Sequence, residues 1–210
     1  IEQSIQAPVF RDKVYKPAVK PTNSALKNQK AINRAIERAS KAGGGKVVIP
    51  EGVYMTGAIR LLSDVNLVVS KGATLRFAYE PALYPLVYTR YEGLDLYNYS
   101  PCIYANGAKN IGITGEGTID GNGANETFWQ WTGVERFGYK KGVTTEDSRF
   151  PRDGNSLGYR AILQKMCEDN VPVKDRVFGM GKGLRMQLVN PVNCENILIE
   201  GVTMLNSPFW

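Results

Sequence analysis

The sequence contains no histidine, and this absence excludes several kinds of active site at once. Among its 210 residues there are only three cysteines, Cys102, Cys167 and Cys194, and no two of them form a C-x-x-C pair. Within this chain, Ser-His-Asp and Cys-His catalysis, histidine acid–base chemistry and Cys/His metal sites are therefore excluded. An odd number of cysteines leaves at least one thiol unpaired within the chain, and we expect buried free thiols.

Long apolar runs are also absent. No stretch approaches the roughly 18 consecutive apolar residues of a membrane-spanning helix, so we expect no membrane span. The residues that follow Ile1 do not form a basic and then apolar signal sequence. Because the first residue is not methionine, removal of an export signal by processing stays open.

The glycine-rich segments do not form a nucleotide-binding or calcium-binding motif. For the segment Gly43–Lys46, a phosphate loop would need glycine in place of Ser40 and serine or threonine in place of Val47. The residues Asp120–Gly123 begin like a calcium-binding loop, but the two residues that follow break the ligand pattern. We therefore expect no cofactor and no metal site.

The formal net charge is +6 and the isoelectric point is near 9.2, which favours an anionic partner. Lysines and arginines are spread along the chain without a nucleic-acid-binding motif, so we do not expect nucleic acid. An acidic polysaccharide suits the same excess of charge. Solubility alone would also account for it.

One strand-turn-strand pattern occurs three times. Its copies are DVNLVVSKGATLRF (64–77), YNYSPCIYANGAKNIGITGEGTIDG (97–121) and CENILIEGVTMLNS (194–207). When Asn66, Asn110 and Asn196 are aligned, the apolar residues of the three strands superpose and Gly115 falls on Gly201. Three weakly similar copies of a short unit predict a repeat architecture.

The repeat unit favours an all-β fold, a parallel β-helix. Each copy has too little apolar surface for its own core, so successive copies must stack. No helical pattern lies between the strands of a copy, although a parallel βαβ sheet would require one. The alternative is an antiparallel sandwich, for which Asn106-Gly107 is a candidate hairpin turn.

The segments around the repeats differ from them in pattern. Residues 1–27 have no sustained period and predict an extended lead-in. From Asn28 to Ala42 the apolar residues recur with helical spacing, with Asn28 as the expected N-cap and Gly43 as the stop. This helix would cover the first coil of the β-helix, which we expect over residues 28–210.

Residues 78–99 are rich in tyrosine and could form a sugar-stacking surface or a packed loop. A second segment, at about 120–183, interrupts the repeat and contains Trp129, Trp131 and a predicted helix from Arg160 to Asp169. A loop of this size is usually functional. A further strand is predicted over 184–189.

The end of the sequence shows no closing helix or polar strand. The last repeat is followed only by NSPFW, which ends at Trp210. An uncovered coil would expose apolar rungs and unpaired strands. We therefore expect the β-helix to be incomplete at its C-terminal end, with the remainder of the same β-helix beyond Trp210 as its partner.

The quoted repeats, with AINRAIERASKAGGGKVVIPEGVYMTG (31–57) and the final NSPFW, resemble the N-terminal half of the polygalacturonase-like enzymes of glycoside hydrolase family 28. The resemblance covers about residues 28–125 and 184–210. It implies a right-handed parallel β-helix and inverting hydrolysis of α-galacturonosyl linkages in pectin-type acidic polysaccharide. It also implies a periplasmic or extracellular enzyme of the cell-wall-degrading kind.

The family's catalytic aspartates, histidine and Arg-x-Lys clamp follow the NSP-x-W motif, so the resemblance implies no catalytic residue in this chain. The segment alone is expected to be inactive. Arg185 aligns with a family arginine and is a candidate substrate-binding residue, although Met186 stands where the family tends to have proline. Trp129 and Trp131 are further candidates. The alternative function is a noncatalytic β-helical binding protein of the tailspike kind.

Overall fold

The computed structural model describes residues 6–144, 146 and 157–210 of the chain. Its contacts divide the chain into two compact units. The coil unit contains residues 1–78, 103–121 and 190–205, and the aromatic unit contains residues 79–102, 122–189 and 206–210. Each unit is described by itself.

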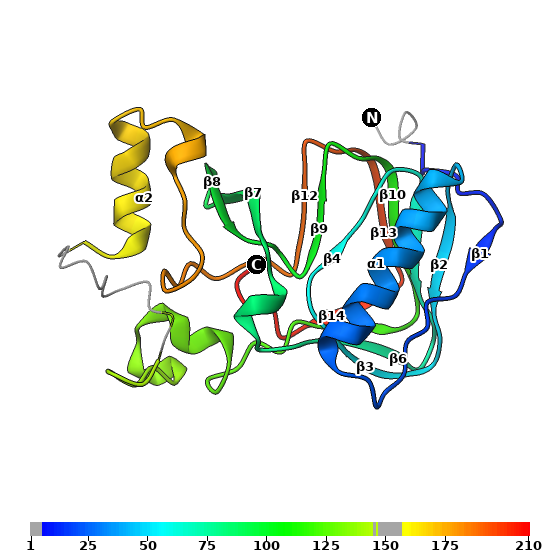
Figure 1. The fold of residues 1–210 in the computed structure, drawn as a ribbon, viewed down its shortest axis with the longest axis horizontal. Helices are drawn as coiled ribbons and strands as arrows, with labels where there is room; N and C mark the ends of the chain where they lie inside the picture. Colours follow the sequence, from blue (N-terminus) through cyan, green and yellow to red (C-terminus); the bar gives the residue numbers. More distant parts are fainter. Residues whose placement is uncertain (1–5, 145, 147–156) are drawn as a thin grey trace. The chain divides into compact units, whose positions relative to one another are not determined.

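The coil unit is a parallel β-helix, as the repeats predict. Its strands form three sheets, and successive coils lie one against the next (Figure 1). All pairings of the first and second sheets, and the pairing of β4 with β9 in the third, are parallel. The first sheet contains β1 (Val14–Tyr15), β2 (Gly45–Ile49), β5 (Val65–Val69), β10 (Lys109–Gly115) and β13 (Glu195–Glu200). The second contains β3 (Gly52–Thr56), β6 (Ala73–Phe77), β11 (Thr118–Asp120) and β14 (Thr203–Leu205). The third contains β4 (Ile59–Arg60), β9 (Ile103–Asn106) and β12 (Val189–Val192).

Stacking of like side chains produces the core of the coil unit. Leu67 on β5 lies in register with Ile113 on β10, which lies in register with Ile199 on β13. The first two are 0% and 2% exposed, whereas Ile199 is 46% exposed. A rung therefore becomes buried only when coils cover it on both sides.

The predicted alignment of the repeats is correct for the second and third copies and wrong for the first. Asn110 and Asn196 occupy equivalent positions, because Ile111 pairs with Ile197. Asn66, however, pairs with Gly112, so the first copy is displaced by two residues. An even displacement keeps every side chain on the same face of its strand, which is why the apolar pattern still matched.

Polar side chains at the start of three strands form a ladder along the stack. Asn196 donates its amide to Asn110 Oδ1 at 2.7 Å, and Asn110 donates to Asp64 Oδ1 at 2.9 Å. All three residues have positive φ angles in the left-handed region, 61° for Asn196, 53° for Asn110 and 64° for Asp64. Asn and Asp tolerate this conformation better than other non-glycine residues, which explains their recurrence.

Helix α1 (Ala25–Lys41) packs against the coil unit through one apolar face and begins earlier than predicted. Its N-cap is Ser24, whose hydroxyl accepts from the Lys27 amide, and not Asn28. Asn28 is fully buried. Its side chain exchanges hydrogen bonds with Lys20 and donates to the Met55 carbonyl at 3.0 Å, so it connects the lead-in and β3 to the helix.

The described part of the lead-in is more ordered than the sequence suggests. Its β1 extends the first sheet, with Val14 paired to Lys46 and Tyr15 to Val47. Asn106-Gly107 connects β9 to β10 without antiparallel pairing between them, so the hairpin alternative is wrong here. In the residues that the structure describes, no helix is both long and apolar enough to cross a membrane.

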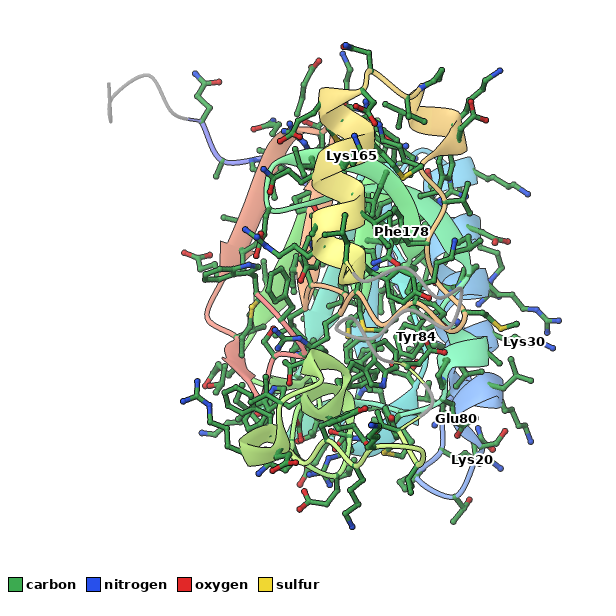
Figure 2. All side chains as sticks on the ribbon, turned by 90° about the vertical axis from the view of Figure 1, so that its left-hand side faces the viewer. Lys20, Lys30, Glu80, Tyr84, Lys165 and Phe178 are labelled. Atoms are coloured by element: carbon green, nitrogen blue, oxygen red, sulfur yellow. The ribbon has the colours of Figure 1, made fainter. Side chains whose placement is uncertain are left out.

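The aromatic unit has a different construction. An antiparallel hairpin of β7 (Leu86–Tyr91) and β8 (Leu94–Tyr99) packs with α2 (Tyr159–Glu168), which agrees with the predicted helix. Leu163 of α2 and Phe178 share its core, while Lys165 points outward from the helix (Figure 2). The predicted strand over 184–189 is absent except for Val189, where β12 begins. Short 3₁₀ helices are η2 (Pro81–Leu83), η3 (Phe128–Thr132), η4 (Glu135–Phe137) and η5 (Val173–Asp175).

Candidate functional site

Arg185 is held against the last residues of the chain. Its guanidinium lies 4.9 Å from the ring centre of Phe209, and its Nη1 donates to the Pro208 carbonyl at 2.9 Å. Phe209 in turn stacks on Tyr91, with ring centres 4.7 Å apart and planes inclined by 3°. Three planar groups from distant parts of the sequence therefore form one stack, which fixes the orientation of the guanidinium.

The charge of Arg185 is not neutralised by an ion pair among the described residues. Partial burial lowers the pKa of its guanidinium, and the neighbouring Tyr91 and Glu92 act in the opposite direction. An arginine stays protonated even when its pKa is lowered, because the ordinary value is above 12. A fixed, half-buried cation without a counter-ion is suited to bind a carboxylate.

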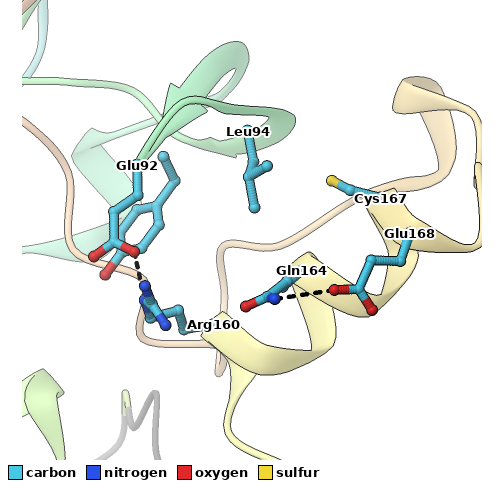
Figure 3. Close-up of a pocket in the computed structure, with 7 residues that line it drawn as sticks. Glu92, Leu94, Arg160, Gln164, Cys167 and Glu168 are labelled. Atoms are coloured by element: carbon cyan, nitrogen blue, oxygen red, sulfur yellow. Dashed lines mark hydrogen bonds and ion pairs between the residues drawn. The ribbon is translucent and has the colours of Figure 1, made fainter.

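A pocket of about 370 Å³ lies between the turn of the β7–β8 hairpin and α2 (Figure 3). Glu92 on the turn forms an ion pair with Arg160, and Gln164 donates to Glu168 at 3.0 Å on the helix. Tyr91 belongs both to this pocket and to the stack under Arg185. Arg160, Gln164 and the two glutamates supply polar groups to the lining, and Leu94 and Cys167 supply apolar surface.

Trp129 positions the same terminal segment. Its indole N–H donates to the Ser207 carbonyl at 3.0 Å, and the neighbouring Gly123 amide donates to the Asn206 carbonyl at 2.7 Å. The side chain is half-buried, so part of the indole remains accessible. Trp129 and Arg185 thus both contact residues 206–210 through backbone carbonyls.

Trp131 is buried, so its side chain cannot contact a sugar directly. The residue is 0% exposed. Its indole donates to the Tyr79 hydroxyl at 2.8 Å, and its ring packs against Tyr99 and Phe128. The structure therefore corrects the predicted role of Trp131 from substrate binding to packing in the core of this unit. Tryptophan in a loop suggested a sugar platform, but the same large apolar ring supplies this unit with its core.

A buried carboxylate was not recognised from the sequence. Glu146 is 6% exposed, and its Oε1 accepts from the Tyr99 hydroxyl at 3.0 Å and from the Gly181 amide at 2.9 Å. Among the residues that the structure describes, its Oε2 has no hydrogen-bond partner. No sequence signal distinguishes Glu146 from an ordinary surface glutamate, because its partners lie 47 and 35 residues away.

The described residues contain no group of three or more His, Cys, Asp or Glu side chains that could hold a metal ion. The three cysteines are free thiols. Cys102 is fully buried, and burial raises the pKa of its thiol well above the ordinary value. A neutral buried thiol is a packing group and not a nucleophile.

Comparison with known proteins gives a consistent result. A probable polygalacturonase from Vitis vinifera is 26% identical over 189 residues, which are 85% of this chain and 33% of that protein. The crystal structure of a hyperthermoactive exopolygalacturonase from Thermotoga maritima matches 100% of this chain and 45% of its own, with 38% identity and a TM-score of 0.88. A family 28 exopolygalacturonase from Yersinia enterocolitica matches with 26% identity and a TM-score of 0.60, over 95% of this chain and 36% of its own.

No protein-family model matches the sequence. The chain is nevertheless polygalacturonase-like in sequence and in fold, as the motifs predict. It spans less than half the length of each of these three relatives.

Proposed function

We propose that the protein to which this polygalacturonase-like chain belongs is a glycoside hydrolase that cleaves α-galacturonosyl linkages in pectin-type acidic polysaccharide. The observation that carries this proposal is the match to the Thermotoga maritima exopolygalacturonase over the whole chain, at 38% identity and a TM-score of 0.88. The positive net charge of +6 supports an acidic substrate.

The proposed reaction inverts the anomeric configuration. Such hydrolysis needs a carboxylic acid that protonates the leaving oxygen and a carboxylate that activates water, separated by roughly 6.5–9.5 Å. We assign neither role to a residue of this chain. We place both groups in the part of the protein that these 210 residues do not span, and we expect the chain alone to be inactive.

Arg185 is the substrate-binding residue that this chain supplies in the proposal. Its guanidinium is oriented by Phe209 and by the Pro208 carbonyl, and it has no acidic partner among the described ion pairs. A galacturonate carboxylate would supply the missing negative charge through a charge-assisted hydrogen bond. Trp129 contributes indirectly, because it holds the backbone at Ser207.

We also propose that a further coil of the same protein covers β13 and β14. The support is the exposure of apolar residues that are buried at the equivalent positions one coil earlier. Ile197 is 42% exposed and Ile111 is 2% exposed. A periplasmic or extracellular location, where pectin is accessible, is part of the same proposal.

The proposed function is tested by incubating the full-length protein with polygalacturonate and measuring new reducing ends. Proton NMR of the first product then reports the anomeric configuration. We expect release of galacturonate or short oligomers with inverted configuration, and no release by residues 1–210 alone. Binding of polygalacturonate by the full-length protein without hydrolysis would contradict the proposal and would favour a noncatalytic β-helical binding protein.

A further inference from the structure

Helix α1 carries five cations on its outer face, which we call the α1 basic face. Its residues are Lys27, Lys30, Arg34, Arg38 and Lys41. At about 100° per residue these positions fall within an arc of roughly 80°, on the side opposite the buried residues of the helix. All five are exposed, and Lys30 projects away from the coils (Figure 2). From Lys27 to Lys41 the face is about 21 Å long.

The cations of this face outnumber the carboxylates of the helix by five to one. None of the five cations takes part in an ion pair among the described residues. The one carboxylate on the described part of the lead-in, Asp12, pairs instead with Lys46 at 2.7 Å. Glu37, at the edge of the face, is the only acidic residue of the helix. The face is therefore an extended strip of a single sign.

This arrangement has a cost within the isolated helix. Lys30 and Arg34, and likewise Arg34 and Arg38, are like charges four residues apart, and such pairs destabilise a helix. The first turn contains no acidic residue, although acidic residues there would be favoured by the helix dipole. An arrangement selected only for stability or solubility would mix the two signs. A bound polyanion would relieve the repulsion.

The face is also hollowed. A pocket of about 400 Å³ lies between the helix and the lead-in, lined by Ala18, Ala31, Arg34, Glu37, Arg38 and Lys41. Ala18 and Ala31 are small residues, so they leave space beside the three cations. A ring with a carboxylate would meet apolar surface at the two alanines and positive charge on the helix. The pocket therefore adds a shaped site to the strip of charge.

We propose that the α1 basic face is a binding surface for polygalacturonate. A linear chain with a carboxylate on every sugar can bind several cations of the strip at once. The choice of polygalacturonate as the ligand rests on the proposed function, which supplies an acidic glycan as substrate. In this role the surface retains the polymer at the protein.

The test compares two double variants of the full-length protein. Arg34→Ala/Arg38→Ala removes two cations of the face, and alanine preserves the helix because it has the highest helix propensity. Lys71→Ala/Lys174→Ala removes two exposed lysines elsewhere and is the matched control. Affinity electrophoresis in gels that contain polygalacturonate, at about 0.05 M salt, measures binding without hydrolysis. Thermal unfolding confirms that both variants are folded.

We expect binding of polygalacturonate to weaken about fivefold in the helix variant, at about 0.5 kcal/mol per exposed contact. The control should retain wild-type binding. Cleavage of trigalacturonate should be unchanged in both, because this substrate is too short to need a second surface. Ala18→Glu, which adds a second carboxylate to the hollow beside Glu37, should also weaken binding to the polymer.

Equal binding by the helix variant and the control would overturn the proposal and leave the α1 basic face as a solvated surface. Tighter binding of duplex DNA than of polygalacturonate, lost in the helix variant, would overturn it in favour of nucleic acid. Binding of fully methyl-esterified, uncharged pectin at equal strength would also overturn it. Failure to cleave trigalacturonate would contradict the proposed function, while α1-dependent binding of the polymer would still support this surface.

Discussion

The guanidinium of Arg185 lies 4.9 Å from the ring centre of Phe209, which is 24 residues later in the sequence. The stack continues to Tyr91, 118 residues before Phe209 in the sequence and 4.7 Å from it in space. This relationship turns a flexible cation into an oriented one. It is the basis of the substrate-binding role that we propose for Arg185.

Arg185→Lys should impair substrate binding in the full-length protein. Lysine retains the charge but loses the planar group that stacks on Phe209 and can bind a carboxylate with two hydrogen bonds. We expect KM for oligogalacturonates to rise roughly five- to thirtyfold, since about 0.5–1 kcal/mol is lost from each of the two interactions. The value of kcat should change little.

Arg60→Lys, the same chemical change at an exposed position of β4, is the control and should leave KM unchanged. Thermal unfolding of each variant separates a binding defect from a loss of structure. If Arg185→Lys retains the wild-type KM, Arg185 stabilises the terminal segment and does not bind substrate.

Trp131→Ala should mainly reduce stability, whereas Trp129→Ala should mainly reduce substrate binding. Trp131 is fully buried among aromatic rings, and its truncation should lower the free energy of unfolding by about 3–5 kcal/mol. Trp129 is half-buried and holds Ser207, so its removal should cost less stability and weaken oligogalacturonate binding. Urea unfolding and binding titrations of the full-length protein measure the two effects. Loss of binding in a fully folded Trp131→Ala variant would contradict this division.

Gly115→Ala should prevent normal stacking of the coils. Gly115 has a φ of +116°, and an added Cβ would lie 2.1 Å from the Val69 carbonyl oxygen of the preceding coil. We expect insoluble protein or a loss of more than about 3 kcal/mol in the free energy of unfolding, because backbone must move.

Gly107→Ala is the matched control for this effect. Gly107 also has a positive φ, +65°, but an added Cβ would meet no atom within 4 Å. Only the cost of the left-handed conformation remains, about 1–2 kcal/mol. Similar unfolding midpoints in urea for the two variants would show that close packing between coils is not the reason for glycine at position 115.

The Cys102 thiol should make stability depend on alkaline pH. Burial raises the pKa of Cys102 in the folded protein, whereas the unfolded thiol has its ordinary value near 9. The folded state therefore keeps a proton that the unfolded state releases above pH 9, and stability falls as pH rises through this range. Between pH 9 and 11 the free energy of unfolding should fall less steeply for Cys102→Ala than for the wild type. The two slopes should differ by up to about 1.4 kcal/mol per pH unit. Parallel curves would contradict the role of Cys102.

The parallel β-helix could be predicted from the sequence because stacking imposes the same requirement on every coil. Ile111 and Ile197 both point inward at equivalent positions, and Gly115 and Gly201 both mark a point of close approach. The strand register with the first copy cannot be determined from the sequence, since shifts by two residues preserve the alternation of faces. Asn66 and Asn110 look equivalent in the sequence, but in the structure Asn66 lies beside Gly112.

Other positions were misassigned because a residue type permits more than one role. Asn28 has the chemistry of an N-cap, but its side chain is buried and satisfied by Lys20, Asn23 and Met55. Ser24 provides the cap instead. Which of the two residues caps the helix depends on the path of the lead-in, whose sequence has no periodic pattern.

The sequence by itself determined the coil, the inward faces of its strands and the outer basic stripe of α1, because each follows from a period along the chain. The tertiary structure decided which cation has a fixed orientation, which tryptophan is buried and which glutamate is buried. Those properties depend on groups such as Tyr91 and Phe209 or Tyr99 and Glu146, which are far apart in the sequence. Contacts between irregular segments leave no repeating pattern in the sequence, so only the folded chain reveals them.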